Sequence, residues 1–247
     1  MSAATAPSSA TGPSSATGPG ALEALLVGLQ LTDSAFPSGR YTLSQGLEGY
    51  LQAKQVDQQS MPELLADLLR HSVGPADATA LALAHRAATA GDFEAVVAID
   101  QRLHASKLNR ELRQACLRTG RQLLDTAQLA LGSPMLDRYA ELVTARTSPG
   151  CQPVAAGVAY AAGGVATEQA VASDLFAFAV GFTGAALRLR LTDHRRAQLT
   201  LRATAPVIAE VTALALRREL ADLGGFSPLA DVMSARHERA EERLFAS

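Results

Sequence analysis

The sequence predicts an all-α protein, a single-domain bundle of roughly eight to ten helices. From residue 21 onward apolar residues recur at helical spacing almost everywhere, and few runs of alternating β-branched residues suggest strands. The 247 residues, 48% of them hydrophobic, are enough to bury a sizeable core. The connections between the expected helices are short, which favours antiparallel neighbours in one bundle.

Residues 1–20 are predicted to be a disordered low-complexity tail, and residues 21–247 to be the all-helical domain. The tail carries no charge, and the hexapeptide SSATGP occurs twice, from Ser8 and from Ser14. It lacks the basic and apolar regions of a secretory leader. Two cysteines are too few for a disulfide framework, so a cytoplasmic location is expected.

The first helices of the domain have recognisable ends. Ser60 and Glu63 form a capping box before an apolar stripe, and Gly74-Pro75 is expected to end that helix. A second helix should run to Gly91. Asp92 can cap a third helix.

A longer helix is expected over residues 108–131, where Gly132 ends it. Ser133-Pro134 suits the start of another, over residues 135–146, followed by a loop. Two Ala- and Gly-rich stretches, 154–166 and 175–187, are shorter than the roughly 20 residues that span a bilayer, which favours closely packed core helices.

The C-terminal part is also predicted to be helical. Asp193 can cap a long helix that continues to residue 223 with a kink at Pro206, and Gly224-Gly225 should close it. A segment with a charged middle follows from residue 227 and ends in apolar residues.

Composition and motifs indicate neither an enzyme nor a nucleic-acid or membrane binder. The formal net charge is −2, and no Walker, HExxH or paired CxxC motif occurs. Ser44 lies in half of a nucleophile elbow, but Thr42 occupies the position that needs glycine. A hydrolase using Ser44 and a helical ligand-responsive transcriptional regulator remain alternatives, although residues 21–75 offer few basic side chains for DNA.

Metal-binding candidates are sparse. Three histidines have a carboxylate one helical turn away, and two ligands do not make a site. These pairs are Asp67 with His71, Asp100 with His104, and His237 with Glu241. The weak candidates for metal contact are Cys151 and His237, and no cofactor of the chain's own is expected.

Three segments look suited to a protein partner. Residues 33–48 form a loop rich in turn residues, in which Gly39 tolerates positive φ. The apolar chain end would gain little unless it docked. A local arginine cluster can bind carboxylates and consists of Arg188, Arg190, Arg195, Arg196 and Arg202. The candidate partner-binding residues are Phe36, Pro37, Gly39, Tyr41, Ser44, Gln45, Glu48, Arg188, Arg195, Arg196, His237, Glu238, Arg243, Leu244 and Phe245.

The segment FPSGRYTLSQGLE, from Phe36 to Glu48, resembles the N-terminal signature of the UreF family of urease accessory proteins. Four further segments resemble family motifs in the same order: NRELR with RTGRQLL from Asn109, GCQPV from Gly150, AALR from Ala185, and HE with RLFAS at the C-terminus. Together they extend over nearly the whole chain from residue 21.

The resemblance implies an all-α, usually dimeric, cytoplasmic protein that is not itself an enzyme. It implies a scaffold that binds urease accessory protein D (H in some organisms), recruits the GTPase accessory protein G and docks on apo-urease, with nickel handled by the complex. The chain departs from the family pattern at two places. Cys151 stands where the family usually has histidine, and residues 191–198 are charged where the family has a neutral run.

Overall fold

The computed structural model describes residues 19–240 and 243–245, and it is helical with no strand in those ranges. The all-α prediction is therefore confirmed. Apart from Pro19 and Gly20, which begin α1, the expected tail lies outside the described residues, as does Glu241. The α-helices are α1 (Pro19–Thr32), α2 (Leu47–Gln52), α3 (Met61–Leu68), α4 (Thr79–Thr89), α5 (Phe93–Ser106), α6 (Arg110–Leu131), α7 (Pro134–Thr144), α8 (Gln152–Ala162), α9 (Thr167–Arg188), α10 (His194–Ala215) and α11 (Pro228–Glu238).

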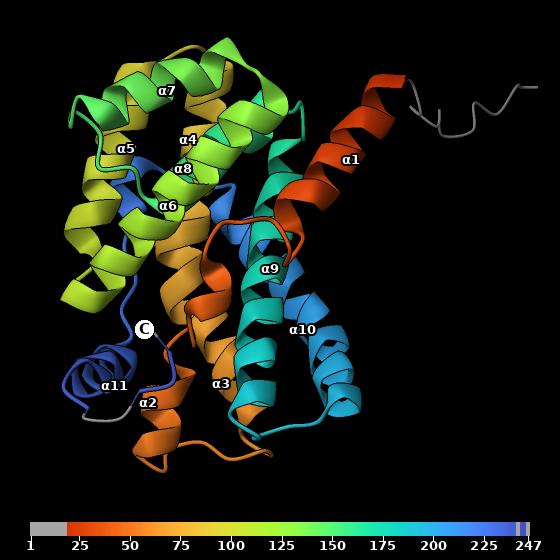
Figure 1. Ribbon diagram of the computed structural model, residues 1–247, viewed down its shortest axis with the longest axis vertical. Helices are drawn as coiled ribbons and strands as arrows, with labels where there is room; N and C mark the ends of the chain where they lie inside the picture. Colours follow the sequence, from red (N-terminus) through yellow and green to blue (C-terminus); the bar gives the residue numbers. More distant parts are fainter. Residues whose placement is uncertain (1–18, 241–242, 246–247) are drawn as a thin grey trace, which may run out of the picture.

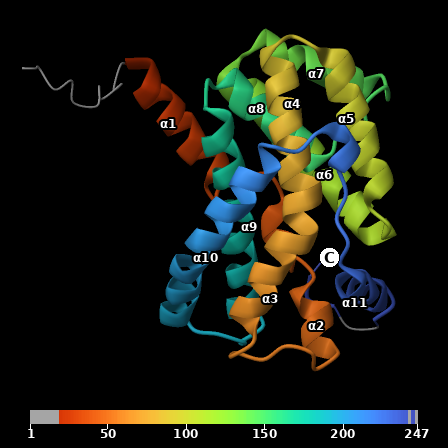
Figure 2. The ribbon, with the colours of Figure 1, turned by 180° about the vertical axis from the view of Figure 1, so that it is seen from behind.

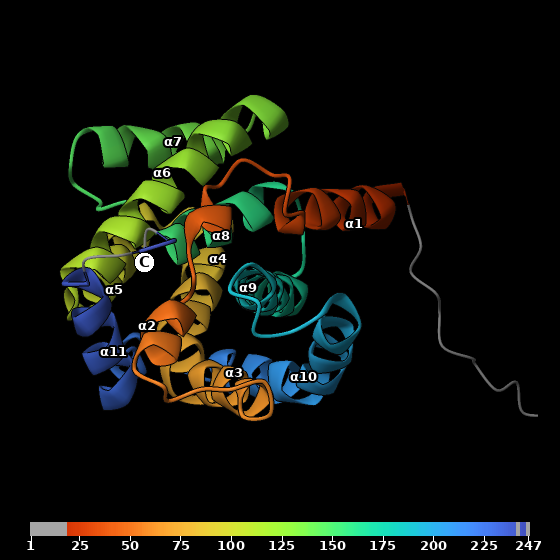
Figure 3. The same ribbon diagram turned by 60° about the horizontal axis from the view of Figure 1, so that its bottom comes forward.

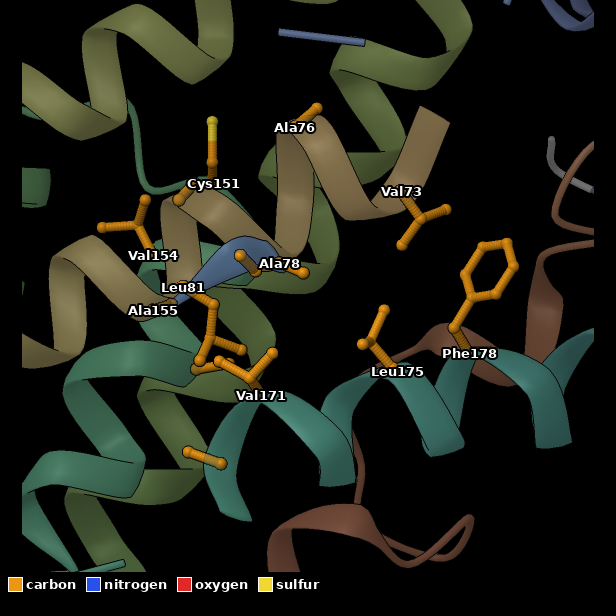
Figure 4. Packing of buried hydrophobic residues seen from close by; sticks show 14 of the residues in the cluster. Val73, Ala76, Ala78, Leu81, Cys151, Val154, Ala155, Val171, Leu175 and Phe178 are labelled. Atoms are coloured by element: carbon orange, nitrogen blue, oxygen red, sulfur yellow. The ribbon is translucent and has the colours of Figure 1, made fainter. Parts of the chain in front are cut away.

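The core is formed where α4, α8 and α9 meet, with α6 and α10 on either side (Figures 1 and 2). Figure 4 shows side chains of α8 and α9 directed toward those of the segment from Val73 to Leu81. A Cβ on Gly157 of α8 would lie 2.7 Å from the carbonyl oxygen of Leu81, so glycine lets these two helices approach closely. The expectation of closely packed Ala- and Gly-rich core helices is confirmed.

Helix α9 is long and apolar enough to cross a membrane by length and composition, with a mean hydropathy of 1.6. It is the one such helix among the described residues, and 56% of its apolar window is buried inside the protein. It contacts α1, α4, α8 and α10, so its apolar composition matches its place in the core.

The prediction that Gly74-Pro75 ends a helix is wrong. The chain stays helical from α3 through a π-helical segment, Leu69–Ala78, into α4. A π turn lengthens the hydrogen-bonded ring and so can accommodate a residue without an N–H group. The carbonyl of His71, four residues before Pro75, accepts a hydrogen bond from the distant backbone N–H of Phe226 at 3.0 Å. The hydroxyl of Thr79 donates to the carbonyl of Gly74 at 3.0 Å, in addition to the backbone N–H of Thr79.

Two further boundaries differ from the predicted ones. Ser60 makes no capping bond to the helix; instead, the carboxylate of Asp57 accepts hydrogen bonds from its backbone N–H and its hydroxyl, at 2.8 and 2.7 Å. Helix α10 runs through Pro206 but ends at Ala215, and residues 220–222 form a separate 3-10 turn, η3 (Leu220–Asp222). The predicted continuation to residue 223 is therefore wrong.

The remaining predicted caps are confirmed. Asp92, Ser133 and Asp193 each accept a hydrogen bond from a backbone N–H in the first turn of the following helix. Gly132 ends α6 in the left-handed conformation, with φ of 55°. Local sequence therefore determines these helix ends.

Gly120 is expected to be intolerant of any side chain. A Cβ there would lie 2.7 Å from the backbone nitrogen of Gln152 and 2.8 Å from the carbonyl carbon of Cys151. Because these obstacles are backbone atoms, Gly120→Ala should lower the free energy of unfolding by at least about 2 kcal/mol, measured by urea denaturation.

Gly184→Ala is the matched control, since Gly184 also lies inside a long helix and a Cβ there meets nothing within 4 Å. That variant should be neutral or more stable by up to about 1 kcal/mol, because alanine has the higher helix propensity. Equal effects of the two substitutions would contradict the close approach of α6 to residues 150–152.

Candidate partner-binding site

The loop of residues 33–48 has an ordered, glycine-dependent path. Gly39 and Gly46 have φ of 75° and 85°, and they precede the short 3-10 helix η1 (Arg40–Thr42) and α2 respectively. A Cβ on Gly39 would collide with the side-chain amide of Gln122 on α6. The expected positive φ at Gly39 is confirmed, and glycine also allows the loop to lie directly on α6.

The carboxylate of Glu48 binds the C-terminal segment to this loop. Glu48 is buried at the start of α2, and Oε1 accepts a hydrogen bond from the backbone N–H of Leu244 at 2.8 Å. Its other oxygen accepts from the N–H of Phe245 at 3.0 Å and lies 2.8 Å from Nε2 of His237. One carboxylate therefore joins segments that are nearly 200 positions apart in the chain.

Glu111 completes the cluster from α6. Its Oε2 lies 3.1 Å from Nδ1 of His237, and its Oε1 accepts from the guanidinium of Arg243 at 3.1 Å. His237 is only 2% exposed, and each ring nitrogen faces a carboxylate oxygen. Two acidic side chains, one imidazole and one guanidinium thus satisfy one another in a network that is buried except at Arg243. Helices α2 and α11, which carry Glu48 and His237, lie side by side in Figures 1 and 3.

Arg188 connects the loop to the chain end by a second route. Its guanidinium carbon lies 4.1 Å from the ring centroid of Tyr41 and 4.3 Å from that of Phe245. Nη1 also donates a hydrogen bond to the backbone carbonyl of Tyr41. Each of these half-desolvated cation–π contacts is worth about 1 kcal/mol, so Arg188 holds both aromatic rings in place.

An ion pair between Arg40 and Asp174 connects the loop to α9. Nη1 of Arg40 donates to Asp174 of α9 at 2.8 Å, and the same carboxylate accepts from the side-chain amide of Gln152 at 3.1 Å. Burial by itself would lower the pKa of Arg40, but the charge and hydrogen bond of Asp174 raise it above its ordinary value. The charged pair is therefore stable in this setting.

The segment before α8 depends on the carboxylate of Asp100, which has no solvent exposure. It accepts from the hydroxyl groups of Tyr139 and Ser148 and from the backbone N–H groups of Gly150 and Cys151. Burial is the main cause of the raised pKa of Tyr139, and the negative charge of Asp100 raises it further. The expected pairing of Asp100 with His104 is wrong, because these four donors occupy the carboxylate.

A cavity of about 140 Å³ lies beneath the loop, between α6, α9 and α11. Its polar lining includes Arg40, Lys107, Cys116, Asp174 and Ser234. The ammonium of Lys107 lies 2.7 Å from a carboxylate oxygen of Asp77. Burial alone would lower the pKa of Lys107, but the negative charge of Asp77 outweighs this effect and the pKa is raised. The size and polarity suit water or a small polar molecule.

The structure brings most of the predicted partner-binding residues together, but only some of them are accessible. Tyr41 and Leu244 are 69% and 64% exposed. Phe36, Ser44, Glu48, His237 and Phe245 are buried; Gly39, Gln45, Arg188 and Glu238 are half-buried; Pro37, Arg195, Arg196 and Arg243 are exposed. The accessible part is a surface formed by Tyr41, Arg188, Arg243 and Leu244, called here the joint surface.

Two expectations about this region need correction. The apolar chain end is not wholly exposed, because Phe245 packs on the protein's own loop and only Leu244 projects. The arginine cluster is divided: Arg188 belongs to the joint surface, whereas Arg195 and Arg196 lie exposed in the first turn of α10, where Arg196 pairs with Asp193 at 3.5 Å.

The metal candidates do not form a ligand set within residues 19–240 and 243–245. No group of three His, Cys, Asp or Glu side chains there could hold a metal ion. Cys151 is buried at the N-terminus of α8, and His237 is bound between Glu48 and Glu111. A nucleophile elbow also needs a strand before its serine, and Leu43 follows a 3-10 helix instead.

Sequence reasoning missed the structural roles of three acidic residues on which the site depends: Asp100, which it paired with His104, and Glu111 and Asp174, which it did not single out. Glu111 lies within the NRELR segment, so a signal for it was present, but nothing in the sequence pairs it with His237. Asp174 is the one charged residue between the two end turns of the apolar helix α9, and a charge in such a place needs a partner. These partnerships form only through the tertiary fold.

Comparison with known proteins gives a consistent result. The profile of the UreF family matches residues 56–205. The chain is 32% identical over 230 residues to the urease accessory protein UreF 2 of Brucella canis, covering 91% of this chain and 93% of that protein. It is 31% identical over 222 residues to the urease accessory protein UreF of Trichodesmium erythraeum, covering 89% of this chain and 95% of that protein. It is also 31% identical over 219 residues to the urease accessory protein UreF of Paenarthrobacter aurescens, covering 88% of this chain and 96% of that protein.

Glu48→Gln should loosen the C-terminal segment. Both carboxylate oxygens accept from N–H donors, so an amide NH₂ in either orientation would face a donor. We expect the free energy of unfolding to fall by about 1–3 kcal/mol and hydrogen–deuterium exchange of a C-terminal peptide to accelerate.

Glu168→Gln provides the control, because Glu168 is exposed in the first turn of α9. It should lower the free energy of unfolding by less than about 1 kcal/mol, through the lost charge at the helix N-terminus, and leave exchange at the chain end unchanged. Unaltered exchange in Glu48→Gln would show that the segment is held by other contacts.

Proposed function

Because the chain belongs to the UreF family of urease accessory proteins, we propose that it is a non-enzymatic scaffold of urease maturation. In this proposal it binds urease accessory protein D (or H), recruits the GTPase accessory protein G, and docks with them on apo-urease. It acts in the cytoplasm as a homodimer and helps to gate GTP hydrolysis. Nickel is the cargo of the complex, and this chain has no cofactor of its own.

The joint surface is the observation that carries the proposal. The buried Glu48 cluster fixes the backbone beneath Tyr41 and Leu244, and Arg188 stacks on the ring of Tyr41. Exposed aromatic and apolar side chains held on a rigid base suit protein recognition, since little conformational entropy is lost when a partner binds. A merely folded bundle does not need such side chains at its surface.

A second apolar surface supports an assembly of several chains. Leu22, Leu25, Leu26 and Leu29 are 56–60% exposed at helical spacing on α1. In Figures 1 and 3, α1 projects from the body of the molecule on the side opposite to α2 and α11. Contiguous exposed leucines of this kind favour burial against a protein, either a second copy or accessory protein D.

Direct nickel binding by a single chain, if it occurs, is expected to be weak. Cys151 and His237 remain its candidates, and each is already engaged with protein groups. A stronger site would need ligands from two chains.

Deleting residues 243–247 should abolish co-purification with accessory protein D while leaving the far-ultraviolet circular dichroism of the bundle nearly unchanged. The deletion removes Leu244 from the joint surface and Phe245 from its contact with Arg188. Leu244→Asp is the milder companion variant, because its exposed side chain can be changed without disturbing Phe245. Undiminished complex formation by both variants would place the D interface elsewhere.

Recruitment of the GTPase should respond differently to two kinds of substitution. Charge reversal of both Arg195 and Arg196 to Glu should weaken recruitment more at low than at high salt, because exposed charges are screened. Tyr41→Ala should weaken it with little dependence on salt. The measurement is a pull-down of the GTPase by the preformed complex with accessory protein D across ionic strength.

Tyr41→Phe is the matched control, since it keeps the ring over Arg188. It should recruit the GTPase nearly as well as the unmodified chain. If the charge-reversed and Tyr41→Ala variants both recruit it normally, these residues serve the homodimer or the D interface instead.

A further inference from the structure

Two thiols from distant parts of the chain meet beside the cavity. Cys116 lies on α6, and Cys151 is the residue immediately before α8. Both are free thiols, and each thiol shifts the pKa of the other, so the two side chains are neighbours. Gly120 lies one turn beyond Cys116 on α6, and its lack of a side chain lets α6 contact the backbone of residues 150–152. This contact keeps the two cysteine-bearing segments close together.

The two cysteines differ in access. Cys116 is half-buried and lines the cavity, whereas Cys151 has no solvent exposure. In Figure 4 the sulfur of Cys151 points away from Leu81 and Val171 of the core. A small reagent that enters the cavity would therefore reach Cys116 first.

They also differ in acidity. The hydrogen bond from Cys151, the positive charge of Lys107 and the backbone N–H of Gln152 lower the pKa of Cys116, against the effects of burial and Asp77. The hydrogen bond to Cys116, burial and the charge of Asp100 raise the pKa of Cys151. Cys116 is therefore the more acidic thiol of the pair, and it is also the one that the cavity makes accessible.

This asymmetry matches the division of roles in a redox-active dithiol, in which an accessible thiolate reacts and a neighbouring thiol resolves the product. A metal site fits the pair less well, because no third His, Cys, Asp or Glu joins them in the part of the chain that is described. The surroundings therefore favour oxidation chemistry over metal binding.

We propose that Cys116 and Cys151 form a site of reversible oxidation, in which hydrogen peroxide converts the two thiols to an intramolecular disulfide. The Cys116 thiolate attacks one peroxide oxygen, the O–O bond breaks, and the leaving hydroxide takes a proton to become water, which leaves a sulfenic acid. The sulfur of Cys151 then attacks the sulfenic sulfur, an S–S bond forms, and a second water leaves with the thiol proton. Two thiols are oxidised by two electrons, and one peroxide is reduced to two waters.

The disulfide would tie α6 to the start of α8 at a sensitive place. Gln152, the next residue, binds Asp174, and Asp174 holds Arg40 of the loop. Oxidation therefore acts on the series of contacts from Gln152 through Asp174 to Arg40, which supports the loop that carries the joint surface. This inference does not depend on the identity of the partners.

Intact-protein mass spectrometry under non-reducing conditions tests the site. The full-length chain, treated with a small excess of hydrogen peroxide, should lose the mass of two hydrogen atoms and become resistant to N-ethylmaleimide after denaturation. Dithiothreitol should restore both thiols. A chain that keeps two alkylatable thiols, or that cross-links to a second chain instead, would overturn the proposal.

Single alanine variants separate the roles of the two cysteines. Cys151→Ala should stop at the sulfenic acid, seen as one added oxygen atom and trapped by dimedone, because the resolving thiol is gone. Cys116→Ala should react much more slowly, since Cys151 is buried and burial also raises the pKa of its thiol. Thermal unfolding of both variants verifies that they are folded, and equal peroxide reactivity of the two would contradict the assigned roles.

Discussion

The structure depends most on the buried carboxylate of Glu48. A carboxylate removed from water is costly unless donors surround it, and here two backbone N–H groups and an imidazole supply them. These donors come from the last part of the chain, whereas Glu48 belongs to the first. The need to satisfy one charge therefore forces the two ends of the chain together, and the joint surface exists only because they meet.

Asp100 and Asp174 are also buried carboxylates that need hydrogen-bond donors around them. Asp100 orders the turn that leads into α8, and Asp174 binds both that turn, through Gln152, and the loop, through Arg40. Glycines make these arrangements possible, since Gly39 and Gly120 let backbone approach α6 without a side chain between them. Buried acids and small residues thus position a loop that has little regular structure of its own.

The sequence was sufficient for the fold class and for many helix ends, because apolar periodicity and caps such as Asp92 and Gly132 act locally. It failed where tertiary context overrides local preference. Pro75 lies inside a π-helical segment, where the carbonyl of His71 accepts from the distant N–H of Phe226, and the hydroxyl of Ser60 binds Asp57 instead of capping α3. For the candidate site, the motifs were visible, but the pairing of Glu48 with His237 and of Arg188 with Phe245 has no local signal.

The residues of the joint surface therefore depend on one another for their positions and do not act as independent contact residues. Arg188 can stack on Phe245 only while Glu48 holds the N–H groups of residues 244 and 245, and its second face then supports Tyr41. Hence a change at any buried member alters the exposed ones. Under the proposed scaffold role, a partner that binds Tyr41 or Leu244 would therefore bind differently when the chain end is undocked.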